Sequence, residues 1–228
     1  MSNPLLLSTK KLHFHQLERL MAARCDVVDY NAIRIDYQPF SIAEQPNYWV
    51  FSSQNAVRSF LANTTAKQHH KPILCVGEKT KSLLEENGQK VIKTAQNMQE
   101  LVVFIQKNMK NEHFLHVCGN RKLPHFAEGM QAASILYDEV TAYHTHLVSR
   151  VQSPEPQGVL FYSPSGVQSY LQDNEIGDSW CFCIGQTTAA AIRPLTTKMT
   201  VSPKPDTDLL VSTAADRSLF ITARCRKS

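Results

Sequence analysis

Five short polar turns in this 228-residue chain have the residue types that bind anions. Each turn follows an apolar run and precedes a helical pattern; the turns are Ser52-Ser53, Gly77–Thr80, Gly119-Asn120, Ser163–Gly166 and Gly185–Thr188. A helix N-terminus attracts negative charge, because its first N–H groups lack helical partners and the helix dipole is positive there. Serine and threonine at such positions are also common N-caps. The turns therefore indicate either plain helix capping or a ligand with several negative charges.

The sequence gives weaker support for a metal site or a catalytic nucleophile than for anion binding. Two His-x-His pairs occur, at residues 13–15 and 144–146, but no cysteine or carboxylate lies at ligand spacing beside them, so we expect no metal. The six cysteines form no Cys-x-x-Cys pair, and Cys181 and Cys183 lie in an apolar run, so we expect buried, reduced thiols. Ser163-Pro-Ser-Gly differs from the Gly-x-Ser-x-Gly pattern of a nucleophile elbow.

Composition narrows the possible partners. The formal net charge is +4, and no lysine and arginine run or basic-aromatic interleaving indicates a nucleic-acid surface. The longest apolar stretches, such as Leu101–Ile105, are too short to span a bilayer. The N-terminus lacks a basic region followed by a long apolar core. We therefore expect a cytoplasmic globular protein that binds neither nucleic acid nor membranes.

An internal repeat organises the chain. VFSSQNAVRSFL (50–61) aligns with LFYSPSGVQSYL (160–171) at an offset of 110, with five identities in twelve positions. LCVGEKTKSLL (74–84) aligns with FCIGQTTAAAI (182–192) at an offset of 108 and shares a cysteine, a glycine and a threonine. Two matched blocks in the same order predict two similar domains, because solenoid repeats have periods of 20–50 residues.

Each repeat block is predicted to form a buried strand, a small polar turn and a helix. Strand and helix alternation predicts α/β domains with parallel, flavodoxin-like sheets covered by helices on both faces. The expected strands are Pro4–Ser8, Asp26–Tyr30, Tyr48–Phe51, Ile73–Val76, Lys90–Ile92, His113–Cys118, Val159–Tyr162 and Cys181–Ile184. Helices are expected after each repeat strand, over Leu12–Ala23 and Met98–Asn108, and from Pro205-Asp206 onward.

Two further segments alternate with the two-residue period of strands, IRIDY at residues 33–37 and a longer one at 139–147. Together with the strands before the first repeat block, they indicate a chain that starts in one domain, crosses to a second and returns. We expect a discontinuous first domain of residues 1–35 and 147–228, and an inserted domain of residues 38–142. The two crossing strands then form a two-stranded connector.

Taken in order, these motifs resemble the uroporphyrinogen-III synthase family: VFSSQNAV, CVGEKT, CGNRKLP, DEVTAYHT, LFYSPSGVQSYL, CIGQTTAAAI and SPKPDTDLL. They cover most of the chain from Tyr48 onward. Two sites depart from the family pattern. Thr9-Lys10-Lys11 stands where Thr-Arg-Pro is common, and Gln54-Asn55 stands where Pro-Arg is common. The resemblance implies two α/β domains joined by a two-stranded ladder, with the N-terminal segment in the C-terminal half.

The resemblance also implies a reaction. The substrate is hydroxymethylbilane, a linear tetrapyrrole of haem biosynthesis with an acetate and a propionate on each ring. A carbon–oxygen lyase of this family, without cofactor or metal, removes water and closes the ring through a spiro intermediate to give uroporphyrinogen III with ring D inverted. A monomer is implied, with transient contact to the upstream hydroxymethylbilane synthase. Because two family arginines are missing, a non-catalytic or diverged two-domain protein that binds a tetrapyrrole or small anion is the alternative.

Tyr143 corresponds to the tyrosine that recurs in the family's connector motif. Its phenol would protonate the departing hydroxyl or position it, although strand tyrosines also serve simply in packing. The resemblance makes the polar turns, and two basic residues near them, the expected carboxylate contacts. The expected substrate-binding residues are Lys10, Ser52, Ser53, Thr80, Gly119, Asn120, Arg121, Ser163, Ser165, Gly166, Thr187 and Thr188.

Overall fold

The computed structural model describes residues 3–42, 46–63 and 71–224, without the side chains of residues 218–224. The chain divides into two compact units. Unit 1 comprises Met1–Arg34 and His146–Ser228, and unit 2 comprises Ile35–Thr145. Among the described residues, no helix combines the length and apolar character needed to cross a membrane.

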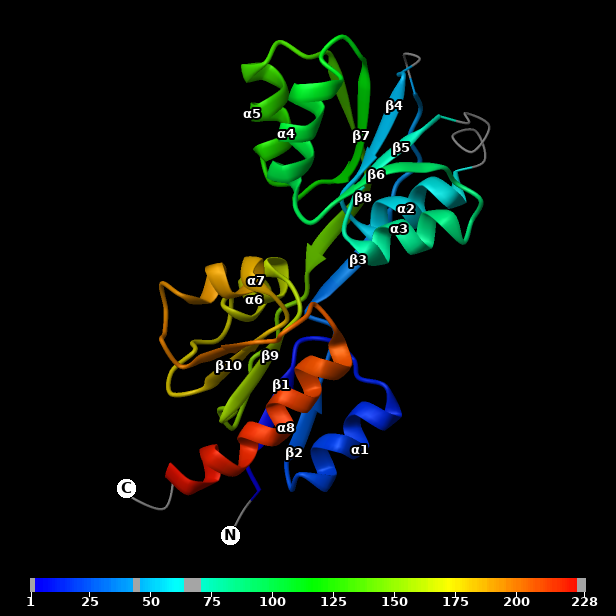
Figure 1. Cartoon of the computed structure of the whole chain (residues 1–228). Coiled ribbons are helices and arrows are strands. Elements are labelled where there is room, and N and C mark those ends of the chain that lie inside the picture. The colour runs from blue at the N-terminus through cyan, green and yellow to red at the C-terminus, as the bar shows by residue number, and fades with distance from the viewer. Residues whose placement is uncertain (1–2, 43–45, 64–70, 225–228) are drawn as a thin grey trace. The chain divides into compact units, whose positions relative to one another are not determined.

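Unit 1 is a five-stranded sheet between two helix layers (Figure 1). All described pairings in the sheet are parallel, and the strand order is β11-β10-β9-β1-β2. If the five strands are renumbered 1 to 5 along the chain, the order read from the β2 edge is 2-1-3-4-5. This is the flavodoxin-like strand order. The strands are β1 (Leu5–Ser8), β2 (Asp26–Asp29), β9 (Gly158–Phe161), β10 (Trp180–Cys183) and β11 (Met199–Val201).

Helices α1 (Phe14–Ala22) and α8 (Thr207–Arg224) cover one face of this sheet, and α6 (Pro164–Tyr170) and α7 (Gln186–Ile192) cover the other. Strand β10 is apolar throughout because both of its faces are buried. Cys181 and Cys183 pack in the core beneath α6 and α7, while Phe182 packs in the core beneath α1 and α8. Successive side chains of a strand point to opposite faces, so burial on both faces requires an unbroken apolar run.

The expectation of buried free thiols is confirmed for the described cysteines. Five are free and buried: Cys25, Cys75, Cys118, Cys181 and Cys183. The sixth, Cys225, lies outside the described residues.

Unit 2 is a six-stranded sheet with the order β3-β8-β7-β4-β5-β6. Its strands are β3 (Ile33–Tyr37), β4 (Tyr48–Phe51), β5 (Ile73–Val76), β6 (Val91–Ala95), β7 (Phe114–Gly119) and β8 (Tyr137–Leu147). Helices α2 (Gln54–Ala62) and α3 (Glu78–Glu85) pack on the face that carries Trp49 and Phe51. Helices α4 (Met98–Asn108) and α5 (His125–Ala132) pack on the opposite face, around Val50 and Phe114.

The repeat blocks occupy equivalent places in the two sheets. Strand β4 lies between β7 and β5, just as β9 lies between β1 and β10. The two sheets therefore match strand for strand when the order β8-β7-β4-β5-β6 is superposed on the order β2-β1-β9-β10-β11. The strands follow one another along the chain in a different sequence in the two units. The expected fold class is confirmed: two similar α/β units with mainly parallel sheets, the first of them discontinuous. The two crossing strands, β3 and β8, are neighbours within the unit 2 sheet.

Candidate functional site

The carboxyl ends of parallel strands collect polar residues at one edge of each sheet, where open α/β sheets bind ligands. In unit 2, Ser52 and Ser53 follow β4, Gly77 follows β5 and Asn120 follows β7. These three strands are parallel through their pairing with β4, so the three turns lie at the same edge of the sheet.

Tyr143 lies over the end of β7 at this edge. The pairing of β7 with β8 shifts register after Cys118, which sets Tyr143 opposite Gly119. The phenol oxygen of Tyr143 is 3.0 Å from Oγ of Ser53, and that Oγ also accepts a hydrogen bond from the backbone N–H of Ala56. Burial raises the pKa of Tyr143, although its hydrogen bond with Ser53 acts in the opposite direction, so the phenol stays protonated and can donate a hydrogen bond.

Glycine at position 119 is a steric requirement of this arrangement. A Cβ built on Gly119 would lie 2.8 Å from the phenol oxygen of Tyr143 and closer still to the ring carbons. Real Cβ atoms essentially never make contacts under 3.0 Å. The aromatic ring therefore rests directly on the backbone of Gly119.

The loop after β7 holds the Tyr143 segment in place. The N–H of Asn120 donates to the carbonyl of Tyr143 at 3.2 Å, and Oδ1 of Asn120 accepts from the N–H of Thr145 at 2.8 Å. The guanidinium of Arg121 donates to the carbonyl of Thr145 at 3.3 Å, while the residue as a whole remains exposed. Asn120 and Arg121 thus position β8, and Arg121 also offers positive charge to solvent.

Thr80 occupies the first turn of α3, after Gly77, whose φ of +85° favours glycine. Its side chain is buried, with only 5% exposed. The N–H groups of Gly77 and Thr80 donate to the carbonyls of Ala95 and Gly77, so the part of this turn that remains accessible to a ligand is Glu78 and Lys79, which are exposed.

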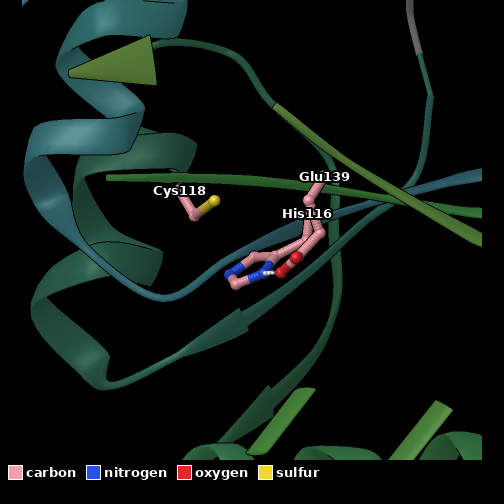
Figure 2. A group of neighbouring side chains, drawn as sticks. All are labelled: His116, Cys118 and Glu139. Atoms are coloured by element: carbon pink, nitrogen blue, oxygen red, sulfur yellow. Dashed lines mark hydrogen bonds and ion pairs between the residues drawn. The ribbon is translucent and has the colours of Figure 1, made fainter. Parts of the chain in front are cut away.

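A second cluster at this edge was not predicted from the sequence. His116 on β7 and Glu139 on β8 are register partners, and Nδ1 of His116 lies 3.0 Å from Oε1 of Glu139 (Figure 2). Nε2 of the same imidazole is 3.1 Å from Oγ of Ser52. The ammonium of Lys122 lies 2.7 Å from the other carboxylate oxygen. Residue spacing gives no signal for this cluster, because 64 residues separate Ser52 from His116.

No metal was expected from residue spacing, yet side-chain atoms of His116, Cys118 and Glu139 lie within 4.8 Å of one another. In the structure these groups already have other partners. Both ring nitrogens of His116 contact protein oxygens, and Lys122 supplies a cation to Glu139. Burial raises the pKa of the Cys118 thiol to about 11, so this sulfur is protonated near neutral pH. We therefore describe the group as a hydrogen-bonded network.

Unit 1 has a corresponding edge. Ser163 follows β9 and caps α6, because its Oγ accepts from the N–H of Gly166 at 3.0 Å. The neighbouring Tyr162 was not predicted as a site residue; its phenol oxygen is 3.1 Å from Oγ of Ser8 at the end of β1. Burial raises the pKa of Tyr162 to about 12. The ammonium of Lys10 lies 5.7 Å from the centroid of the Tyr162 ring, so this edge carries positive charge.

The other expected contacts of unit 1 differ in exposure. Ser165 is half-buried, and Gly166 is buried at the start of α6. A Cβ on Gly166 would lie 3.4 Å from Oγ of Ser163, which leaves little space there. Thr187 is exposed at the start of α7 and can offer its hydroxyl. Thr188 is only 2% exposed, so its position can offer the backbone N–H group alone.

The fold has known counterparts. No curated protein sequence matched the chain. Uroporphyrinogen-III synthetase from Helicobacter pylori aligns over 94% of this chain and 99% of its own, with a TM-score of 0.68 and 16% identity. A mutant uroporphyrinogen III synthase from the extremely thermophilic bacterium Thermus thermophilus aligns over 95% and 99%, with a TM-score of 0.74 and 11% identity. At these identities the two structures establish similarity of fold.

The sequence itself matches the family model described as Uroporphyrinogen-III synthase HemD over residues 18–212. This match extends through all of unit 2 and through most of the second segment of unit 1, together with half of the first. The chain therefore belongs to the uroporphyrinogen-III synthase family.

Proposed function

We propose that this protein is a uroporphyrinogen-III synthase, which dehydrates hydroxymethylbilane and closes it with inversion of ring D. The observation that carries the proposal is the family match over residues 18–212, which includes both units. The arrangement of Tyr143, Ser53 and Gly119 supports it, because it holds a protonated phenol at the ligand-binding edge of unit 2.

In this proposal Tyr143 assists the loss of water. Its phenol donates a hydrogen bond, and then its proton, to the departing hydroxyl group as the carbon–oxygen bond breaks. The resulting cation is attacked by the substituted carbon of the last ring, which forms the spiro intermediate. Completing the macrocycle releases a proton from carbon, and this proton restores the phenol. Because the substrate ionises readily, the main task of the protein is to orient the last ring and exclude water.

Each unit has polar turns at the carboxyl edge of its sheet that can bind carboxylates of the substrate. The first-turn amides of the helices, the hydroxyls of Ser53, Ser163 and Thr187, and the cations of Lys10 and Arg121 are suitable donors. A single exposed contact of an anion with a helix N-terminus contributes about 0.3–1 kcal/mol. Many such contacts are therefore needed, and a substrate with two carboxylates on each ring can make them.

The test is an isomer assay. Hydroxymethylbilane is generated enzymatically, the purified protein is added, and the porphyrin isomers are separated after oxidation. We expect type III product in excess, and a much slower yield from Tyr143→Phe. Type I product alone, as in spontaneous closure, would refute the proposal. Saturable binding of the tetrapyrrole with type I product alone would instead identify a non-catalytic binding protein.

A further inference from the structure

Ser52, His116 and Glu139 lie in line on one face of the unit 2 sheet. Val50, His116 and Glu139 are register partners on the adjacent strands β4, β7 and β8. Ser52 stands two residues beyond Val50, so its side chain is directed to the same face. The distances are 3.1 Å from Oγ of Ser52 to Nε2 of His116 and 3.0 Å from Nδ1 of His116 to Oε1 of Glu139.

The protons in this line can be assigned from the charges. Burial alone would raise the pKa of Glu139, but hydrogen bonds from His116 and Lys122 outweigh it and lower the pKa. Glu139 is therefore ionised near neutral pH, and a carboxylate only accepts hydrogen bonds. The proton of the neutral imidazole consequently lies on Nδ1, which leaves Nε2 to accept the hydrogen bond from the hydroxyl of Ser52.

The imidazole and the carboxylate are held firmly. The side chain of His116 is only 2% exposed, and its ring centroid lies 4.6 Å from that of Phe126. The ammonium of Lys122 fixes the second oxygen of Glu139 (Figure 2 shows the first oxygen hydrogen-bonded to His116). Ser52, by contrast, is partly exposed at the edge of the sheet. A buried imidazole thus faces the hydroxyl of a partly exposed serine.

Donors for a developing negative charge are close along the chain. Helix α2 begins at Gln54, two residues after Ser52. Within the described part of the chain, the structure records no hydrogen-bond partner for the backbone N–H groups of Gln54 and Asn55. N–H groups at a helix N-terminus stabilise an oxyanion, because the helix dipole is positive there.

We propose that Ser52, His116 and Glu139 form an acyl-transfer site that hydrolyses activated carboxylic esters, an activity separate from the synthase reaction. Oγ of Ser52 attacks the ester carbonyl carbon while Nε2 of His116 takes its proton. The carbon–oxygen bond to the alcohol then breaks, and His116 returns the proton to the departing alkoxide. Water, deprotonated by His116, cleaves the acyl-serine and regenerates Ser52. Glu139 positions the imidazole and stabilises its protonated form.

The protein is tested as the full chain with two probes, a tagged fluorophosphonate and p-nitrophenyl acetate, each with EDTA present and, separately, with added zinc. Fluorophosphonate phosphonylates an activated serine with loss of fluoride. We expect labelling in EDTA, mapped to Ser52 by peptide mass spectrometry, and slow turnover of the ester. Ser52→Ala should abolish both signals. Ser82→Ala, which removes a serine of α3 in the same unit, is the matched control and should leave both unchanged.

The partners of Ser52 are tested by conservative variants. His116→Gln should slow labelling by about 10²–10⁴-fold, the usual contribution of a general base. Glu139→Gln should also slow labelling, whereas Glu139→Asp should restore part of the rate. A low-field proton resonance from Nδ1 of His116 should be present in the wild type and in Glu139→Asp and be absent from His116→Gln. Thermal unfolding of each variant identifies any that fail to fold.

Three results would overturn the proposal. The first is no labelling of the folded wild-type protein. The second is labelling at a residue other than Ser52, or labelling that is unchanged in a folded His116→Gln variant. The third is labelling that requires zinc and disappears in EDTA, which would identify His116, Cys118 and Glu139 as a metal site.

Discussion

Replacing Gly119 by alanine tests whether the backbone of β7 positions Tyr143. The added Cβ would lie 2.8 Å from the phenol oxygen and 2.6 Å from one ring carbon, where an ordinary van der Waals contact is 3.4–4 Å. The ring must therefore move by several tenths of an ångström or more, away from Oγ of Ser53, now 3.0 Å from the phenol oxygen. Overpacking of this kind costs about 1–3 kcal/mol of stability. We also expect synthase turnover to fall at least as far as in Tyr143→Phe.

A double-mutant cycle separates this clash from other effects of the substitution. The free energy of unfolding is measured by urea denaturation for Gly119→Ala, for Tyr143→Ala and for the double variant. Once the aromatic ring is absent, the alanine at position 119 meets no clash. The coupling between the two substitutions should therefore be about 1–3 kcal/mol, most of the cost of Gly119→Ala.

The control for this cycle is Gly185→Ala in unit 1. Nothing lies within 4 Å of a Cβ at Gly185, and its φ of −171° suits any residue. Alanine stabilises the protein by lowering the entropy of the unfolded chain, but it is a poorer N-cap than glycine. Because the two effects oppose each other, the free energy of unfolding should change by no more than about 0.5 kcal/mol. The reasoning is refuted if Gly119→Ala is equally destabilising with and without the Tyr143 ring, or if it leaves stability and isomer yield unchanged.

Three further predictions concern ionisable groups. Tyr143→Phe should lower the rate of type III formation about 10- to 100-fold in the isomer assay, because the phenol assists a substrate that also ionises unaided; an unchanged rate would remove Tyr143 from the mechanism. The lowered pKa of Glu139 contributes stability that is present above its unfolded value of about 4.3 and is lost as pH falls through the folded pKa. The unfolding free energy of Glu139→Gln should consequently be lower than that of the wild type at pH 7 and fall less toward pH 3, and parallel pH curves would contradict this. Burial raises the thiol pKa to about 11 for Cys118, about 12 for Cys181 and about 11 for Cys183. Iodoacetamide at pH 8 should therefore alkylate these thiols only after the protein unfolds, which mass spectrometry can follow. Rapid alkylation of the native protein would contradict this and show that the cores open.

Much of the fold was predictable because its signals are local. Buried parallel strands are short apolar runs, and the strands Tyr48–Phe51 and Ile73–Val76 were predicted with the bounds that the structure has. Strand β8 begins at Tyr137, two residues before the expected start, because Tyr137 pairs with Phe114 and pairing depends on a distant partner. The three-residue strand Met199–Val201 was not predicted, since so short a segment shows no period.

The candidate site likewise has a part that was predictable from local sequence and a part that was not. Tyr143 and the polar turns were predictable, because each belongs to a motif that is continuous in sequence. The contact of Tyr143 with Gly119 follows from a register shift between β7 and β8, and no residue pattern predicts that shift. The contact of Ser52 with His116 depends on which strands are neighbours and which residues face the same side. Strand register is thus the information that sequence patterns lack.

The discontinuity of unit 1 has a consequence for how the chain is made. Strand β1 pairs with β2, which follows it closely, but also with β9, which is synthesised about 150 residues later. At about 5–20 residues per second on the ribosome, roughly 8–30 seconds separate the two strands. Unit 2 is contiguous and can complete its sheet within that interval. The nascent β1 meanwhile has an open strand edge, which is a template for wrong pairing until β9 emerges.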